Sequence, residues 1–343
     1  MKKSSTLTLK KVAEILGVSN ATVSNAFNRP DQLSKKKREE ILAACSELGY
    51  LGPNQAARSL RKGSFGIVAI ILPDSLEYMV SDPVASQFMQ GVASVLETGN
   101  ANVLLFAGHS KSISTVVDFV DGFICYGAPR NPDLISQLAQ TTKKVVTVDF
   151  NIEGRACVNI DNKQAAYEIT QRAVSANDSN VAVLGLRLIP SDQVCRVYDN
   201  KLLDTQSSIS HRRLDGYMQA LSDKGVALTG DRIWNVPESN IELAAIAARE
   251  TLTIEPRPSV ILCMSDLIAL ATLREASAMG LNVPQDVKVV GFDGIDESTR
   301  STPKLTTIQQ NSVLKGRTAA QLFLNDKSSD DLLPYTIQDG DSC

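Results

Sequence analysis

The amino-acid sequence predicts an α/β body of two doubly wound parallel-sheet subdomains, preceded by a small all-α headpiece with a helix-turn-helix. Three observations predict this fold class. Residues 1–51 carry helical periodicity and helix caps but no strand pattern. From Gly66 onward, short continuous apolar runs alternate with amphipathic helices, as expected of strands buried on both faces of a parallel sheet. The chain has 343 residues, which leaves room for a small domain and about two ordinary ones.

The first two predicted helices lie within residues 8–28, where Gly17 marks the bend between them and Ser19 caps the second. On the second helix, helical spacing puts Val23, Ala26 and Phe27 on one face. The opposite face is small and rich in amides, and comprises Asn20, Ala21, Ser24, Asn25 and Asn28. Asn can donate to and accept from the N6/N7 edge of adenine, and Ala can pack against a thymine methyl group. This pattern favours a helix that reads bases in the major groove; a solvated helix at the start of an enzyme is the alternative.

A third predicted helix closes the headpiece. Ser34 caps it, Gly49 ends it, and its apolar stripe is formed by Ile41, Leu42, Cys45 and Leu48. Residues 1–62 hold 12 Lys and Arg against 5 Asp and Glu, whereas the whole chain has 35 against 38. A basic head therefore precedes an acidic body, as phosphate contacts would require. The run 35–38 of this helix, all Lys and Arg, also fits the ordinary polar start of a helix.

Residues 52–64 predict a hinge helix or linker. Pro53 and Asn54 favour a helix start and Gly63 a stop, which leaves about two turns, too short to be stable alone in water. Basic residues on this segment (Arg58, Arg61 and Lys62) suggest that DNA orders it, and a passive tether is the alternative.

The body, residues 65–343, shows the alternating pattern of an open α/β sheet. Apolar runs predict strands at 66–72, 102–106, 122–126, 144–148, 180–186, 259–263 and 287–292. Amphipathic patterns predict helices at 84–97, 163–174, 212–224, 241–251 and 267–279. Sheets of this kind bind ligands beyond the carboxyl ends of their strands.

Polar residues follow several of these strands. Asp74, Asp149 and Asp293 follow predicted strands, and Ser265 and Asp266 follow another. Carboxylates in such places can bridge the vicinal hydroxyls of a sugar or ribose, and Arg213 at the start of a helix can supply complementary donors. An Asp at a strand end is equally the ordinary N-cap of the next helix.

Other classes of protein find little support. The chain contains no GxSxG, no P-loop and no GxGxxG, and its two histidines, His109 and His211, are far apart. No cofactor and no metal site are expected. The six cysteines contain no CxxC pair, no apolar run approaches a membrane span of about 20 residues, and no secretory signal is evident, so we expect a cytoplasmic protein with reduced thiols.

These residues together resemble the LacI/GalR family of transcription regulators over essentially the whole chain. TLKKVAEILGVSNATVSNAFN resembles the family's headpiece signature, PNQAARSLRKG its hinge helix and RRLDGYMQAL its RxxG helix. The family's long effector-domain signature resembles the stretch MSDLIALATLREASAMGLNVPQDVKVVGFDGIDESTRSTPKLTTIQQ. The resemblance implies a periplasmic-binding-protein-like body that binds an effector and dimerises.

The resemblance also implies site residues. Asn20, Ala21 and Asn25 fall where such repressors read bases, and Leu60 falls on the hinge leucine that wedges into the minor groove. The remaining positions implied to contact DNA or hold the turn are Thr8, Ser19, Thr22, Ser24, Asn28, Ser34, Asn54 and Arg58. Those implied to line the effector cleft are Asp74, Asp149, Arg213, Ser265, Asp293 and Gln310. Ser265 stands where sugar-binding members often have Asn, Ser312 where several have an aromatic residue, and Gly52 adds one residue at the hinge entry.

The resulting hypothesis is a homodimeric repressor on a pseudo-palindromic operator. Its N-subdomain is expected to span about 65–165 plus 292–322, and its C-subdomain about 166–291 plus 323–343. One guanidinium, Arg213, faces at least three cleft carboxylates, so we expect a neutral sugar, polyol or nucleoside, with the nucleoside disfavoured by scarce aromatic surface. The alternatives are a transporter solute-binding protein and a sugar-active enzyme with an appended basic head.

Overall fold

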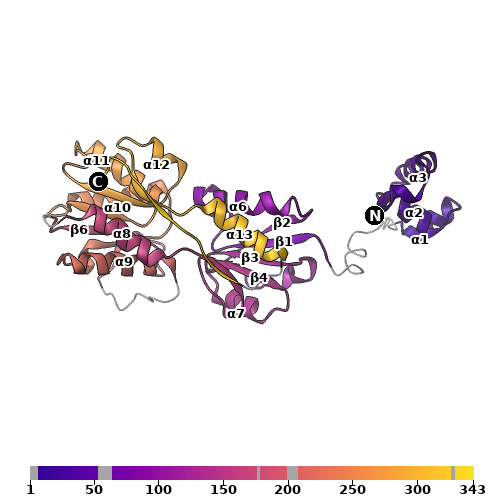
Figure 1. Ribbon diagram of the computed structural model, residues 1–343, viewed down its shortest axis with the longest axis horizontal. Coiled ribbons are helices and arrows are strands. Elements are labelled where there is room, and N and C mark those ends of the chain that lie inside the picture. The colour runs from indigo at the N-terminus through magenta and orange to yellow at the C-terminus, as the bar shows by residue number, and fades with distance from the viewer. Residues whose placement is uncertain (1–6, 53–63, 176–177, 199–207, 326–328) are drawn as a thin grey trace, which may run out of the picture. The chain divides into compact units, whose positions relative to one another are not determined.

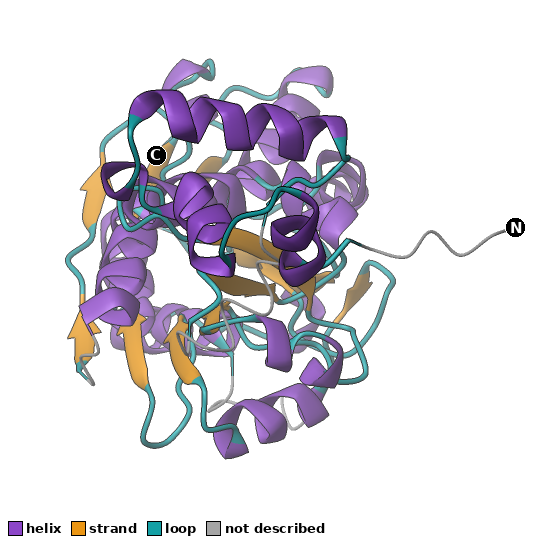
Figure 2. Cartoon of the chain, turned by 90° about the vertical axis from the view of Figure 1, so that its right-hand side faces the viewer, coloured by secondary structure: helices purple, strands orange, loops and turns teal. Residues whose placement is uncertain are grey.

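The structure is a computed structural model that describes residues 7–52, 64–175, 178–198, 208–325 and 329–343 (Figure 1). The chain divides into two compact units, Met1–Gly66 and Ile67–Cys343, which are described separately below. Figure 2 distinguishes the helices and strands of both units.

The first unit is the predicted three-helix headpiece. Its elements are α1 (Leu9–Ile15), α2 (Asn20–Asn28), the 3-10 turn η1 (Pro30–Gln32) and α3 (Lys35–Glu47). The predicted caps are confirmed, because the Ser19 hydroxyl accepts from Thr22 N and the Ser34 hydroxyl accepts from Lys37 N. Gly17 has a φ of +61°, a left-handed conformation that suits glycine at the bend. The core of the unit comprises Val12, Ala13, Val23, Ala26, Ile41, Cys45 and Tyr50.

The second unit contains two lobes, each built on its own sheet. The first lobe has a six-stranded sheet in the order β12-β5-β4-β3-β1-β2. Its strands are β1 (Ile67–Leu72), β2 (Asn102–Ala107), β3 (Gly122–Tyr126), β4 (Lys144–Val148), β5 (Ala156–Asn159) and β12 (Asp330–Leu332), all paired in parallel. Helices α5 (Leu76–Ser81), α6 (Pro83–Leu96) and α13 (Ser312–Asn325) contribute to the core on one face, and α7 (Pro132–Gln140) to the core on the other, where the short 3-10 turns η2 (Ile113–Thr115) and η3 (Val117–Phe119) also lie.

The second lobe has a seven-stranded sheet in the order β13-β11-β10-β9-β6-β8-β7. Its strands are β6 (Val181–Leu186), β7 (Cys195–Arg196), β8 (Ile233–Val236), β9 (Val260–Cys263), β10 (Lys288–Asp293), β11 (Thr306–Gln309) and β13 (Thr336–Gln338). Helices α8 (Asn162–Ala173) and α9 (Ile209–Asp223) cover one face, and α10 (Ile241–Thr253) and α11 (Asp266–Ala278) cover the other. The short elements η5 (Gly230–Arg232) and α12 (Asp296–Arg300) complete the lobe.

The predicted subdomain boundaries need correction. Residues 292–309 do not belong to the first lobe, because β10 and β11 pair with each other and with β9 in the second sheet. Of the predicted segment 292–322, only the α13 portion lies in the first lobe, where it packs against α6. Residues 323–343 are also divided, since β12 pairs with β5 in the first sheet and β13 with β11 in the second. The chain therefore crosses between lobes after β5, after β11 and after β12.

The packing of α13 on α6 depends on two glycines. A Cβ at Gly316 would lie 2.2 Å from the Phe88 carbonyl oxygen, and one at Gly91 would lie 2.1 Å from the Val313 carbonyl oxygen. Only hydrogen at these positions lets the two helix backbones approach so closely. Within the described residues, no helix is long and apolar enough to cross a membrane.

Candidate functional site

The outward face of α2 is the candidate nucleic-acid interface. Asn20 and Ala21 are exposed, and Ser24, Asn25 and Asn28 are half-buried, on the face opposite the core residues of this helix. The Asn28 amide donates to the Ser24 carbonyl at 2.9 Å, so it braces its own helix. The structure thus places the predicted base-reading residues on one accessible helix face.

Three of the residues implied to contact phosphates or hold the turn are helix caps. Thr8, Ser19 and Ser34 are exposed, and each accepts a hydrogen bond from a backbone N–H in the first turn of its helix. Thr22 joins Ser19, with 2.8 Å between the two hydroxyl oxygens. Arg38, the last residue of the basic run 35–38, ties α3 to α2, because its Nε donates to the Ala26 carbonyl near the end of α2 at 3.0 Å. Asn54, Arg58 and Leu60 lie outside the described residues.

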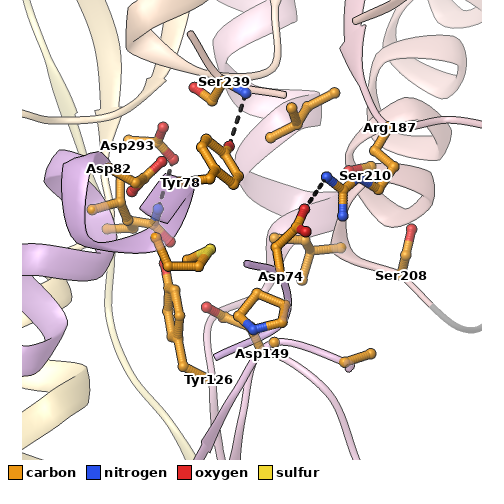
Figure 3. Close-up of a pocket in the computed structure, with 18 residues that line it drawn as sticks. Asp74, Tyr78, Asp82, Tyr126, Asp149, Arg187, Ser208, Ser210, Ser239 and Asp293 are labelled. Atoms are coloured by element: carbon orange, nitrogen blue, oxygen red, sulfur yellow. Dashed lines mark hydrogen bonds and ion pairs between the residues drawn. The ribbon is translucent and has the colours of Figure 1, made fainter. Parts of the chain in front are cut away.

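In the second unit, a cavity of about 190 Å³ lies where loops of the two lobes meet (Figure 3). Asp74 and Asp149 reach it from strand ends of the first sheet, and Asp293 and Gln310 from strand ends of the second. Four of the six predicted cleft residues therefore line this pocket. The other lining side chains that the argument uses are Tyr78, Asp82, Tyr126, Arg187 and Ser239.

Arg213 and Ser265 do not line the pocket but support residues that do. Arg213 is buried, lies with its guanidinium 3.6 Å from the centre of the Phe292 ring, and places Nη1 3.5 Å from Asp293 Oδ1. Ser265 caps α11 by accepting from Ile268 N, and its hydroxyl lies 2.7 Å from that of Ser239. Both residues are thus one contact removed from the cavity.

An ion pair joins the two lobes beside the cavity. Arg187, directly after β6, places Nη2 2.5 Å from Asp74 Oδ2, and Arg130 places Nε 3.4 Å from the same oxygen. Burial would raise the pKa of Asp74, but the hydrogen bond and charge of Arg187 outweigh it and hold the pKa below its usual value. Asp74 is therefore a carboxylate at neutral pH, already paired with cations of the chain.

The floor of the pocket is a hydrogen-bonded series of buried side chains. Lys315, on α13, donates to both carboxylate oxygens of Asp149, at 2.7 and 2.9 Å, and to Gln310 Oε1 at 2.6 Å. Gln310 Nε2 in turn donates to Asp293 Oδ1 at 2.7 Å. Burial raises the pKa of Asp293 well above the ordinary carboxyl value, although Arg213 opposes the shift.

The remaining wall combines tyrosines with an acidic residue. Asp82 caps α6 by accepting from Ala85 N at 2.8 Å, and burial raises the pKa of its carboxyl group. Tyr78 accepts from Ser239 N at 2.8 Å, which is another contact between the lobes. Tyr126 stacks on Phe88 with ring centres 4.6 Å apart. Two aromatic side chains, Tyr78 and Tyr126, thus line the pocket.

The charge balance predicted for this site is wrong. The sequence set one guanidinium against three carboxylates, whereas Asp74 is paired with Arg187 and Arg130, and Asp149 with Lys315. Arg187 could have been found by the rule that identified Asp74, since it directly follows a predicted strand. Lys315 gave no comparable signal, because it lies within a helix and its ion-pair partner Asp149 is 166 positions away in the chain. Asp82 and Tyr126 were also missed.

Both units match the sequences of known protein families. Residues 8–54 match the family model described as bacterial regulatory proteins, lacI family, and residues 201–343 match the model of a periplasmic binding protein-like domain. The chain is 33% identical to an HTH-type transcriptional regulator of Mycobacterium tuberculosis, over 92% of this chain and 90% of that one. It is 28% identical to the HTH-type transcriptional repressor CytR of Escherichia coli K12, over 94% of this chain and 91% of that one.

A solved structure is similar along nearly the whole chain. The transcriptional regulator CelR in its cellobiose complex aligns with a TM-score of 0.69 at 25% identity, and the alignment covers 98% of this chain and 100% of that one.

Proposed function

Because this chain belongs to the LacI family of bacterial transcription regulators, we propose that it is a repressor controlled by a small neutral polyhydroxylated effector. Family membership makes the chain a DNA-binding transcription regulator rather than an enzyme. The proposal adds the repressing role, a homodimer on a pseudo-palindromic operator, and a cytoplasmic location. Two-fold symmetry of the protein would be matched by two half-sites in the DNA.

The proposal assigns the headpiece, residues 1–51, to operator binding. Asn20, Ala21 and Asn25 read bases in the major groove, which is supported by their place on the accessible face of α2. The caps Thr8, Ser19 and Ser34 contact phosphates near the helix N-termini, where the partial positive charge favours anions. Residues 52–64, with Asn54, Arg58 and Leu60, complete the DNA contacts by family resemblance alone.

The observation that carries the effector proposal is the pairing of pocket carboxylates with cations of the chain. Asp74 and Asp149 each form an ion pair, and Asp293 lies near Arg213. A phosphorylated ligand would have to take a cation from its carboxylate and leave that carboxylate unpaired in a buried site, which is costly. Neutral hydroxyl groups can instead donate to the remaining lone pairs of the carboxylates and accept from Arg187.

The volume of the cavity limits the size of the effector. Its volume of about 190 Å³ lies below the range of roughly 300–1,000 Å³ typical of drug-sized ligands. A monosaccharide or small polyol is therefore favoured over a nucleoside, even though Tyr78 and Tyr126 offer aromatic surface. CelR was solved with cellobiose, a neutral sugar, which supports the same chemical class.

A thermal-shift screen of the full chain tests the effector class. The panel contains ribose, glucose, glycerol and cellobiose, together with ribose 5-phosphate and glucose 6-phosphate. We expect stabilisation by at least one neutral member, lost in Asp293→Asn and retained in Asp178→Asn, which alters a carboxylate paired with Lys288 outside the pocket. A response confined to the phosphorylated sugars would refute the proposal.

A gel-shift assay on genomic fragments tests operator binding. The full chain should select a small set of fragments, and a chain lacking residues 1–63 should select none. Footprinting of a selected fragment should reveal two related half-sites, and a single asymmetric site would contradict the dimeric mode of binding.

A further inference from the structure

We infer that Lys315 is a positioning residue for effector recognition, which orients the acceptors of both lobes from beneath the pocket. The inference rests on the proposed effector-binding role of this pocket. Lys315 lies on α13 and is 1% exposed. It does not line the cavity, but the side chains that accept its hydrogen bonds, Asp149 and Gln310, both do.

The Lys315 ammonium group is fully satisfied by these two residues. An ammonium has three protons to donate, and the three acceptors within reach are Asp149 Oδ1 at 2.7 Å, Asp149 Oδ2 at 2.9 Å and Gln310 Oε1 at 2.6 Å. Both carboxylate oxygens of Asp149 are therefore held by one cation. The orientation of the carboxylate plane is fixed by contacts that a ligand does not have to supply.

The same contact determines which way the Gln310 amide faces. Because Oε1 accepts from Lys315, the Nε2 end is directed to Asp293 Oδ1, to which it donates at 2.7 Å. Asp293 is thereby left with its other oxygen as the acceptor for a ligand hydroxyl. Removing the ammonium would free the amide to rotate by 180° and present its carbonyl oxygen to the carboxyl group of Asp293.

Lys315 also connects the two lobes. Asp149 follows β4 of the first sheet, whereas Gln310 and Asp293 follow β11 and β10 of the second. The series Asp149, Lys315, Gln310 and Asp293 thus runs from one lobe to the other under the cavity. A ligand that bonds to both carboxylates would find their separation already set by this series.

A purely structural role does not account for a lysine at this position. Buried ion pairs generally add little net stability compared with apolar side chains of similar volume, because desolvation offsets the attraction. Apolar residues one and two turns further along α13, Ala319 and Phe323, already pack in the core of the first lobe. The specific contribution of the ammonium is the orientation of Asp149 and Gln310.

Lys315→Met in the full chain tests this inference, with Lys288→Met as the matched control. Lys288 also forms an ion pair, 2.7 Å from Asp178 Oδ2, but is partly exposed and stands at the opposite end of β10 from Asp293. With the neutral sugar panel as probes, we expect affinity to fall by at least about tenfold in Lys315→Met and to change less than twofold in Lys288→Met. Equal affinities in Lys315→Met and the unaltered chain would overturn the inference.

A double variant keeps the test decisive if the single variant folds poorly. Asp149→Asn combined with Lys315→Met removes both charges, so no unpaired ion remains buried. If Lys315 acts through Asp149 as well as Gln310, the double variant should lose less affinity for the sugar panel than the sum of the losses in Asp149→Asn and Lys315→Met. Losses of affinity that add would contradict a positioning role.

A measurement that needs no sugar tests this inference independently of the proposed function. In a crystal structure of Lys315→Met, we expect the Asp149 carboxylate and the Gln310 amide to leave their present orientations. Side chains that stay in place would overturn the inference. If no panel sugar binds the unaltered chain, the effector proposal fails, and the crystal structure still decides whether Lys315 positions these residues.

Discussion

Arg187 of the second lobe binds Asp74 of the first, with 2.5 Å between Arg187 Nη2 and Asp74 Oδ2. Arg187 has a φ of +48°, in the left-handed region that few residues other than glycine adopt. Its Nε and Nη2 also donate to the Pro237 carbonyl, at 3.1 and 3.0 Å. The guanidinium is thus held by its own lobe and presented to the facing one, so that it closes the side of the pocket.

Replacing Arg187 by Gln should loosen this closure. Asp74 would keep Arg130, 3.4 Å away, but lose its shorter partner, so the expected loss of unfolding free energy is about 1 kcal/mol. Urea denaturation at neutral pH measures it. Arg130→Gln serves as the comparison and should lower the free energy of unfolding less, because Arg130 is more exposed and lies farther from Asp74. A larger loss in Arg130→Gln would contradict the conclusion that Arg187 is the main partner of Asp74.

Asn25→Ala should weaken binding to the operator by roughly 1–3 kcal/mol and binding to random DNA much less. The reason is that a base-reading side chain discriminates between sequences, whereas a phosphate contact does not. Fluorescence anisotropy at fixed salt concentration gives both affinities. Equal losses on both DNAs would mean that Asn25 only positions the backbone.

Gly316→Ala should destabilise the body by about 1–3 kcal/mol, since the added methyl group would meet the Phe88 carbonyl oxygen at 2.2 Å. Helix propensity alone would predict a gain from the same change. Thermal unfolding distinguishes the two expectations. Arg317→Ala, at an exposed position of the same helix, should have little effect.

Stability should fall in acid partly through Asp178. Burial opposes ionisation of this carboxyl group, but hydrogen bonds from Lys288 and Ser175 outweigh it and lower its pKa. Because the folded pKa lies below the unfolded value of about 3.9, this contribution is complete above that value and is lost as the pH falls toward the folded pKa. Denaturation at a series of pH values should therefore show a shallower acid loss for Asp178→Asn than for the unaltered chain. Parallel curves would exclude the contribution.

Much of the fold follows from local signals in the sequence. The caps Ser19 and Ser34 were predicted from residue type and spacing alone, and the structure confirms both. Each of the seven segments predicted as strands forms one, as in β1 and β6. The four-residue strands β5, β8 and β11 were missed because each contains Asn or Gln and so shows no continuous apolar run, unlike the four-residue strand β9.

The residues of the candidate site likewise fall into those that local sequence predicts and those that only the tertiary structure reveals. Asp74, Asp149 and Asp293 were predicted because each lies at the carboxyl end of a buried strand, and strand polarity alone brings the carboxyl ends of parallel strands to one edge. Nothing local reveals that Arg187 would pair with Asp74, or Lys315 with Asp149, 166 positions away in the chain.

By itself, the sequence determined the all-α head, the α/β body and the family, because helix caps, periodicity and motifs are properties of neighbouring residues. Only the tertiary structure decided where the chain crosses between lobes, and therefore which cation meets which carboxylate. Strand β11 hydrogen-bonds to β10 in the second sheet while the helix that follows it packs on α6 in the first. That crossing places Gln310 between the lobes and Lys315 under the pocket. The carboxylates of Asp74 and Asp149 are paired with cations that lie far from them in the sequence.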